Sequence, residues 1–269
     1  MQVSKSGYYY WKNIPQSPRS RRNDKILLNI IHAFKRSRMT YGSPRIYQEL
    51  KAKGIQVSLN KVARLTSRNN IHAHFSVRHK KAKIPRNNVN FANNILNKEF
   101  SATQPNTKWV SDTTFVHTRQ GWLYLATIVD LYSRKVVGWA MSANNDTQMI
   151  TRALQMAINN KPRQQQVLLH SDQGSTYRAY EYIKLFKENN ITQSMSRKGE
   201  CHDNAVAESF FNTIKTELIN QQTYQTRRQA KSSIFEYIEV FYNKVRRHST
   251  IGYYSPNDYE KMFYKGRLP

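Results

Sequence analysis

Two aspartates stand where the sequence predicts β-strands, and their settings indicate chemistry rather than folding. The apolar run 167–169 ends at Asp172 and Gly174, the pattern of a buried strand that leads into a turn. Asp112 lies among strand-forming residues such as Trp109 and Phe115. Because strands are depleted in aspartate, an aspartate in mid-strand indicates a task that overrides its structural propensity.

A third acid, Glu208, lies on a predicted helix. Apolar residues recur around it at helical spacing, after Asp203 or Asn204, either of which can cap the helix. Asn212 and Lys215 follow Glu208 at offsets of four and seven residues, which return to one face at about 3.6 residues per turn. A carboxylate and a cation therefore share one stripe of this helix.

Three carboxylates brought together would form a site for hard cations. Most of the 17 acidic residues are expected to be solvated surface charges, so no single one is informative. Magnesium prefers oxygen ligands and takes one or two carboxylates, so Asp112, Asp172 and Glu208 are enough to seat a pair of ions. Two ions about 3.5 to 4 Å apart can activate an oxygen nucleophile and stabilise the leaving oxygen in phosphodiester cleavage. We expect folding to gather these acids into one metal-holding cluster.

The charge balance points to nucleic acid as the partner. The 269 residues carry 43 Lys and Arg against 17 Asp and Glu, a net charge of +26. The excess is uneven, because residues 1–111 hold 22 basic and 3 acidic residues and the remainder holds 21 and 14. This asymmetry predicts a DNA-binding front end attached to a more ordinary globular body.

Compartment and covalent chemistry are also limited by the sequence. No apolar run approaches the roughly 20 residues of a membrane span, and residues 1–11 lack the apolar stretch of a secretory signal. We therefore expect a soluble cytoplasmic protein with no membrane partner. Cys201 is the only cysteine, which excludes a disulfide within the chain and a Cys-rich zinc site.

The first hundred residues read as a basic, helical region. Residues 1–24 are a basic tail, and apolar spacing predicts an amphipathic helix over 25–38. Residues 71–107 are a basic linker, with a short helix over 89–100 that leads into the next domain. A charge run of this kind is usually solvated, although it can also follow a phosphate backbone.

Residues 25–70 contain a helix-turn-helix candidate. Ser43 and Ser58 can cap two short helices, Pro44 suits a first helical turn, and Gly54 ends the first helix. A generic helical hairpin is the alternative. In the DNA-binding interpretation, the second helix presents three cations to DNA: Lys61, Arg64 and Arg68.

From residue 108 the pattern changes to alternating strands and helices. Three strands joined by tight connections predict an antiparallel meander, and a helix that joins two later strands favours a parallel crossover. A long helix follows residue 222. The expected elements are strands over 109–118, 122–131, 135–141, 167–169 and 191–195, and helices from Asp146 or Thr147 through 158, over 177–189 and around Glu208.

Several separated motifs make the chain resemble the second-frame (OrfB) transposases of the IS3 family of bacterial insertion sequences. The motifs are HSDQGSTY, SRKGECHDNAVAESFFNTIKTEL and YNKVRRHSTIGYYSP. The spacing of the acids is also part of the resemblance: 59 residues separate Asp112 from Asp172, and 35 separate Asp172 from Glu208. The resemblance extends from about Tyr41 to Tyr259, and those enzymes are similar to retroviral integrases in their catalytic core.

The resemblance implies a fold, a reaction and a set of partners. The fold is α/β, a ribonuclease-H-like mixed sheet with flanking helices over 108–222, with 223–269 packed on it. The reaction is cleavage and transfer of insertion-sequence ends by a DDE transposase with two Mg²⁺ ions, for which Mn²⁺ is a substitute. The partners are double-stranded DNA, both terminal repeats and target, a second copy of the chain, and a first-frame protein fused upstream by frameshifting. The location is the bacterial nucleoid.

The resemblance also assigns roles to residues. Asp112 bridges the two ions, while Asp172 and Glu208 hold one each. Lys215 contacts DNA near the metals, where local pairing with an acid is the alternative. Further DNA contacts are expected from Arg197, Lys198, Arg246 and Arg247.

Three other polar residues receive structural roles. His170 beside Asp172 is expected to make a supporting hydrogen bond rather than act as a base, because metal-bound water needs none. Asp130 and Asp203 are expected to serve as turn or cap residues. Two rival functions stay open: a DNA-binding regulator without catalytic activity, and a ribonuclease-H-like nuclease that cleaves without joining.

Overall fold

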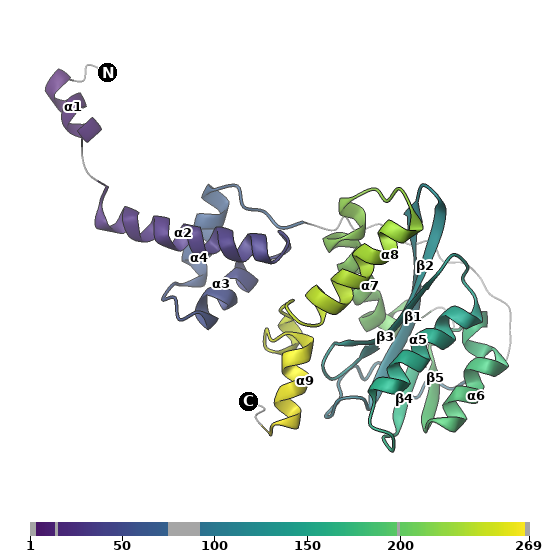
Figure 1. Cartoon of the computed structure of the whole chain (residues 1–269). Coiled ribbons are helices and arrows are strands. Elements are labelled where there is room, and N and C mark those ends of the chain that lie inside the picture. The colour runs from purple at the N-terminus through teal and green to yellow at the C-terminus, as the bar shows by residue number, and fades with distance from the viewer. Residues whose placement is uncertain (1–3, 14–15, 75–91, 198–199, 267–269) are drawn as a thin grey trace. The chain divides into compact units, whose positions relative to one another are not determined.

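The computed structural model describes residues 4–13, 16–74, 92–197 and 200–266, shown in Figure 1. They fall into two compact units, Met1–His74 and Phe75–Pro269. Each unit has its own buried core, and each is described by itself. None of the helices in these ranges is long and apolar enough to cross a membrane.

The first unit is helical and begins earlier than the sequence predicts. A helix was expected from residue 25, but α2 starts at Pro18, because the Ser17 side chain accepts a hydrogen bond from the Ser20 backbone and proline suits the first turn. A further helix lies within the predicted tail and buries none of its residues. The helices are α1 (Lys5–Asn13), α2 (Pro18–Arg36), α3 (Ser43–Ala52) and α4 (Leu59–Arg68).

The paired helices α3 and α4 match the predicted turn. Gly54 has a φ of +73°, which favours glycine, and the Ser58 side chain caps α4 by accepting from the Lys61 backbone. The expected Ser43 cap is wrong, because Gly42 occupies the N-cap position. The Ser43 hydroxyl instead lies 3.1 Å from that of Thr66 and ties the two helices together.

The second unit is built on a five-stranded sheet of order β3-β2-β1-β4-β5. The predicted antiparallel meander is confirmed, since β1 pairs with β2 and β2 with β3. The predicted parallel crossover is also confirmed, because β4 runs parallel to β1, and β5 is parallel at the edge. The strands are β1 (Lys108–Thr118), β2 (Gly121–Asp130), β3 (Val136–Ser142), β4 (Val167–Ser171) and β5 (Ile191–Met195).

Helices cover both faces of this sheet (Figure 1). On one face, α5 (Thr147–Asn160) and α6 (Tyr180–Glu188) enclose the main core with Trp109 and Ile128. Val129, the next residue on β2, lines the opposite face beside α7 (Ala205–Glu217). The helix α8 (Arg227–Glu236) also contacts β1 and β2.

Gly138 explains how closely α5 approaches the sheet. A Cβ atom at this position would lie 2.2 Å from the Ala153 backbone oxygen, a distance that real atoms do not adopt. Any side chain at residue 138 would therefore push α5 away from β3.

Some boundaries differ from the predictions for local reasons. Residues 92–100 form no helix, although one was expected over 89–100, of which 89–91 lie outside the described ranges. The helix predicted over 177–189 is split into a 3₁₀ turn, Ser175–Arg178, and α6. Beyond Glu236, α8 continues as a π-helical turn, Tyr237–Tyr242. The last helix in the described ranges is α9 (Pro256–Tyr264).

Candidate active site

Asp112 and Asp172 are brought together by the pairing of β1 with β4. Parallel pairing aligns Trp109 with Leu169 and Val110 with His170, and each aspartate follows two residues later. Burial raises the pKa of the Tyr177 phenol well above its usual value, and the charges of Asp112 and Asp172 raise it further. Both carboxylates therefore lie near the same buried hydroxyl.

Local backbone bonds hold both carboxylates. An Oδ1 atom of Asp112 accepts from the Thr113 backbone N–H at 2.7 Å, and Oδ1 of Asp172 accepts from that of Gly174 at 2.8 Å. A Cβ at position 174 would lie 2.9 Å from the Asp172 oxygen. Glycine at this position therefore leaves room for the carboxylate, and both aspartates stay half-buried, within reach of a ligand.

The helix that carries Glu208 is docked directly beside Asp112. The Asn204 side chain donates from Nδ2 to the backbone oxygen of Ser111 at 3.0 Å. Asn204 occupies the N-cap position of α7 but makes no capping bond with its side chain, which instead donates to the strand. Glu208 is half-buried and lies one turn further along the helix. The start of α7 is thus fixed to the strand that carries the first aspartate.

The three acids do not form a ready metal cluster. Within the described ranges, no group of three or more His, Cys, Asp or Glu side chains is arranged to hold a metal ion. The gathering of all three carboxylates around a metal ion therefore stays a prediction. The donor types suit a hard cation such as Mg²⁺, and the strands bring one pair together. A complete site would need the Glu208 side chain to join Asp112 and Asp172.

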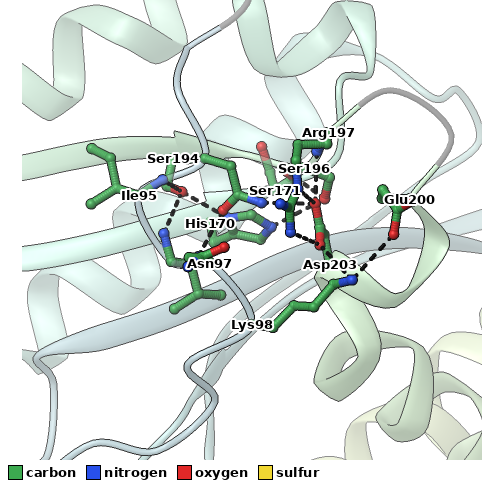
Figure 2. A network of polar contacts seen from close by, with 12 residues as sticks. Ile95, Asn97, Lys98, His170, Ser171, Ser194, Ser196, Arg197, Glu200 and Asp203 are labelled. Atoms are coloured by element: carbon green, nitrogen blue, oxygen red, sulfur yellow. Dashed lines mark hydrogen bonds and ion pairs between the residues drawn. The ribbon is translucent and has the colours of Figure 1, made fainter.

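A buried histidine supports the strand that ends at Asp172 (Figure 2). His170 is fully buried, with Nδ1 2.8 Å from the Ser194 hydroxyl and Nε2 3.1 Å from that of Ser196. The Ser194 oxygen already accepts two backbone N–H groups of residues 95–96, so its own hydrogen donates to Nδ1. The Nε2 hydrogen then donates to Ser196, whose hydroxyl donates to the Ser171 backbone oxygen.

This network keeps His170 neutral. Burial lowers the pKa of His170 to about 4, so the ring carries no proton on Nδ1 at neutral pH. Both nitrogens are engaged by serines on β5 and the segment after it, which excludes a free basic nitrogen at this site. The expected supporting role is confirmed, although its partners are serines rather than Asp172.

The loop before α7 is held by a charged cluster around Asp203 (Figure 2). The Asp203 side chain is fully buried and accepts three bonds from Arg197, at 2.9, 3.1 and 3.1 Å. Asn94 donates a further bond at 2.7 Å, and the Lys98 ammonium lies 3.7 Å away. The Arg197 hydrogen bond is the main cause that lowers the pKa of Asp203 to about 2. Asp203 therefore anchors the loop instead of capping a helix.

Asp130 has the turn role expected of it. Its buried carboxylate accepts from the backbone of Asn106 and from the backbone and hydroxyl of Ser133, and burial raises its pKa. These bonds close the turn between β2 and β3. Asp130 is therefore excluded from the candidate active site.

The predicted DNA contact of Arg246 is wrong. Its side chain is 4% exposed and makes paired hydrogen bonds to the Glu217 carboxylate, the shortest being 2.7 Å. The Tyr237 hydroxyl donates to the same carboxylate at 2.7 Å. Arg246 thus joins the end of α7 to the chain after α8 and cannot present its charge to DNA.

The other predicted cations keep their assignments as predictions. Arg64 and Arg68 are exposed and share a stripe of α4 with half-buried Lys61, and half-buried Arg247 donates to the Tyr253 backbone oxygen. The Arg197 side chain is half exposed, and Lys198 lies outside the described residues.

Lys215 has a neighbour that the sequence reasoning missed. Its ammonium lies over the ring of Phe115, 5.2 Å from the centroid. The docking role of Asn204 and the serine partners of His170 were also missed, since each depends on residues distant in sequence. The strand alternation that leaves Phe115 outside the core was the one available signal.

The family models that match this chain divide it into a helical first part and an integrase-like second part, as the structure does. Two models described as integrase core domain match residues 102–201 and 189–256, and one described as HTH-like domain matches residues 21–81. The predicted ribonuclease-H-like mixed sheet, preceded by a helix-turn-helix region, is confirmed. A chain of the simian T-cell lymphotropic virus intasome, solved with PP2A regulatory subunit B56 gamma, matches at 12% identity and a TM-score of 0.50. It covers 86% of this chain and 73% of its own and shows the fold alone.

Curated relatives match over nearly the whole length. The insertion element IS600 uncharacterized 31 kDa protein of Shigella sonnei is 38% identical over 263 residues, which cover 98% of this chain and 97% of the relative. The transposase InsF for insertion sequence IS3A of Escherichia coli (strain K12) is 37% identical over 262 residues, 97% of this chain and 91% of the relative.

Proposed function

Because this chain belongs to the IS3 family of insertion-sequence transposases, we propose that it cuts one strand at an end of its element. The freed 3′ hydroxyl then attacks a phosphodiester at the other end of the same element, forming a new phosphodiester bond and releasing the 3′ oxygen of the strand that is attacked. In this reaction Asp112, Asp172 and Glu208 hold the metal. The rejoined product of the two ends would be a circle that is later inserted into target DNA.

The observation that carries this proposal is the placement of two aspartates on paired strands with a docked helix beside them. The register of β1 with β4 pairs Val110 with His170, two residues before Asp112 and Asp172. The bond from Asn204 to Ser111 fixes the first turn of α7 next to that pair. Two residues 60 positions apart and a helix from a third segment thus converge on one end of the sheet.

The residues of the chain divide the work between holding charge and positioning. Mg²⁺, or Mn²⁺ in its place, would supply charge neutralisation at the phosphate and a lowered pKa for the attacking oxygen. Asp112 and Asp172 would provide two carboxylates, each oriented by a bond from a nearby backbone N–H. Glu208 provides the third from a helix. Mutual repulsion between the carboxylates favours a cation between them.

DNA would be held by both units. The cations of α4, Lys61, Arg64 and Arg68, suit a duplex backbone or groove, and Lys215, Arg197, Lys198 and Arg247 would contact the strand near the acids. We assign residues 25–70 to end binding, 108–222 to catalysis and 223–269 to a segment packed on the catalytic core. Two ends must be held at once, so we propose a homo-oligomer, with a first-frame fusion as a further partner, acting at the bacterial nucleoid in the cytoplasm.

A joining assay on paired terminal-repeat DNA tests this function. The wild-type chain with Mg²⁺ or Mn²⁺ should produce joined ends, whereas Asp172→Asn should join none and still bind the same DNA. Glu181→Gln is the matched control, because Glu181 is an exposed acid on α6 and its removal should leave joining unchanged.

The rival functions give different products in the same assay. A nuclease of the same fold would release cut strands without joining them. A DNA-binding regulator would bind the ends and leave them intact. Either pattern from the wild-type chain, supplied with metal and with the first-frame portion, would overturn the strand-transfer proposal.

A further inference from the structure

An exposed aromatic group lies on the β1–β2 hairpin beyond the candidate active site. Phe115 is 54% exposed and Trp122 is 46% exposed, and their rings meet edge to face with centroids 5.1 Å apart. His117 pairs with Trp122 across the strands, with ring centroids 5.2 Å apart. Large aromatic side chains are costly to leave in water, so such a group indicates a binding surface.

Cations surround these rings. The Lys215 ammonium lies 5.2 Å from the centroid of the Phe115 ring. Arg227 donates from Nε to the Trp122 backbone oxygen at 3.0 Å, and Arg119 is exposed at the turn of the hairpin. The hairpin segment 113–129 contains no acidic residue. The patch is therefore aromatic and positively charged, which suits a polyanion better than an apolar protein surface.

The patch is close to the proposed catalytic acids along two elements. Phe115 follows Asp112 by three residues on β1, about 10 Å along the backbone at about 3.3 Å per residue. Side chains three residues apart on a strand point to opposite faces, so the contact of Lys215 with Phe115 is what links the patch to the helix of Glu208. Lys215 follows Glu208 by seven residues on α7, again about 10 Å at 1.5 Å per residue. About three base steps of a DNA strand span that distance at about 3.4 Å each.

We propose that Phe115 and Trp122, flanked by His117 and Lys215, form a stacking site for an unpaired base of the DNA strand whose phosphate lies at the acids. This inference rests on the proposed function for the identity of the nucleic acid. Base stacking on aromatic rings is independent of sequence, and cations beside the rings hold the backbone. The site would keep the strand end unpaired and fix its register against the acids.

The test uses element-end DNA with a three-nucleotide single-stranded overhang that carries 2-aminopurine, whose fluorescence is quenched on stacking. The full chain is used with Ca²⁺ in place of Mg²⁺. We expect quenching with the wild-type chain and with Trp122→Phe, and loss of quenching with Trp122→Leu, which keeps apolar volume but lacks a flat ring. Affinity for the overhang DNA should fall about tenfold in Trp122→Leu and stay unchanged for fully paired DNA.

Phe235→Ala is the matched control. Phe235 is 50% exposed and also meets a tryptophan edge to face, Trp139 at 5.9 Å, but it lies on α8. Its removal should leave quenching unchanged. Equal weakening on paired and overhang DNA, unchanged quenching in Trp122→Leu, or a change of oligomer mass without a change of quenching would overturn the stacking site.

Failure of the stacking site can be told apart from failure of the proposed function. Asp172→Asn should join no ends and still quench the 2-aminopurine signal. If the wild-type chain quenched the signal but joined no ends, strand transfer would be contradicted and the stacking site supported. If it joined ends without quenching, the stacking site would be contradicted and strand transfer supported.

Discussion

The two ends of α7 are held in different ways, and Glu208 lies near the end whose cations face water. At the C-terminal end, Glu217 and Arg246 form a pair whose side chains are 8% and 4% exposed. At the N-terminal end, the buried Asp203 is held by Arg197 and Lys98, whose side chains are 50% and 43% exposed. The C-terminal end of α7 is thus held by a buried ion pair. The N-terminal end, beside the candidate site, is held in part by cations that face solvent.

This contrast bears on how the Glu208 carboxylate would reach the two aspartates. Ion pairs that face water are weak and exchange their partners readily, whereas a buried pair resists separation. The first turn of α7 is also held by the bond from Asn204 to Ser111, so the Glu208 side chain, rather than the helix, has to move toward the aspartates. Glu208 is in that first turn, so its carboxylate can be drawn to the two aspartates by a bound cation.

The largest loss of stability is expected at the C-terminal end of α7, where the ion pair is buried. Arg246→Ala would leave the Glu217 carboxylate buried without its partner, and removal of one member of such a pair costs about 3 to 5 kcal/mol. Urea unfolding of the full chain measures this loss. Arg247→Ala is the control and should cost much less, because Arg247 is half-buried and donates to a backbone oxygen. Equal losses in the two variants would refute the proposed anchor.

The next effect is a pH dependence from the network around His170. The pKa of His170 is about 4 in the folded chain against 6.5 for the free side chain. As pH falls from 6.5 to 4 the unfolded state takes up a proton that the folded state refuses, so stability is lost in that window by up to about 1.4 kcal/mol per pH unit. Below pH 4 this contribution levels off.

Stability measured from pH 7 to 4 checks this prediction. His170→Gln removes the titrating group and should flatten the curve between 6.5 and 4. Asp203 affects stability at lower pH than His170 does. Its pKa is about 2 in the folded chain and 3.8 for the free side chain, so its contribution to stability is lost only as pH falls from about 3.8 to 2. A variant curve as steep as that of the wild type would show that His170 is not buried and neutral.

A smaller effect on stability is expected at the docking bond of α7. Asn204→Ala removes the bond from Nδ2 to Ser111, which is worth about 1 kcal/mol. Strand joining should fall by more than this loss predicts, because Glu208 would no longer be held beside Asp112. Asn160→Ala is the control, because it removes another bond from a side chain to a strand. If strand joining fell only as far as the loss of stability predicts in both variants, Asn204 would have no positioning role.

Sequence patterns predicted the sheet and the elements that carry the acids well, because those depend on local signals. Alternation gave the strands around Asp112, and the 3.6-residue spacing gave the helix of Glu208. The Ser58 cap and the Gly54 turn follow from single residue types. Such features require no knowledge of what lies across the fold.

What could not be predicted depends on contacts between distant segments. Arg246 looks like a surface cation in a basic tail, and only its pairing with Glu217, 29 residues earlier, shows that it is buried. The role of Asn204 depends on a strand 93 residues earlier. Likewise, the geometry of a metal site depends on side-chain placement across β1, β4 and α7, which no spacing reveals.

The central claim is that carboxylates from β1, from the end of β4 and from α7 together hold the metal ions, and Mn²⁺ binding measured by electron paramagnetic resonance tests it most directly. With end DNA bound, Asp112→Asn, Asp172→Asn and Glu208→Gln should each weaken Mn²⁺ binding, while Glu181→Gln should bind as the wild type does. If Glu208→Gln held Mn²⁺ as tightly as the wild-type chain, the helix would have no part in the metal site and the account would be contradicted.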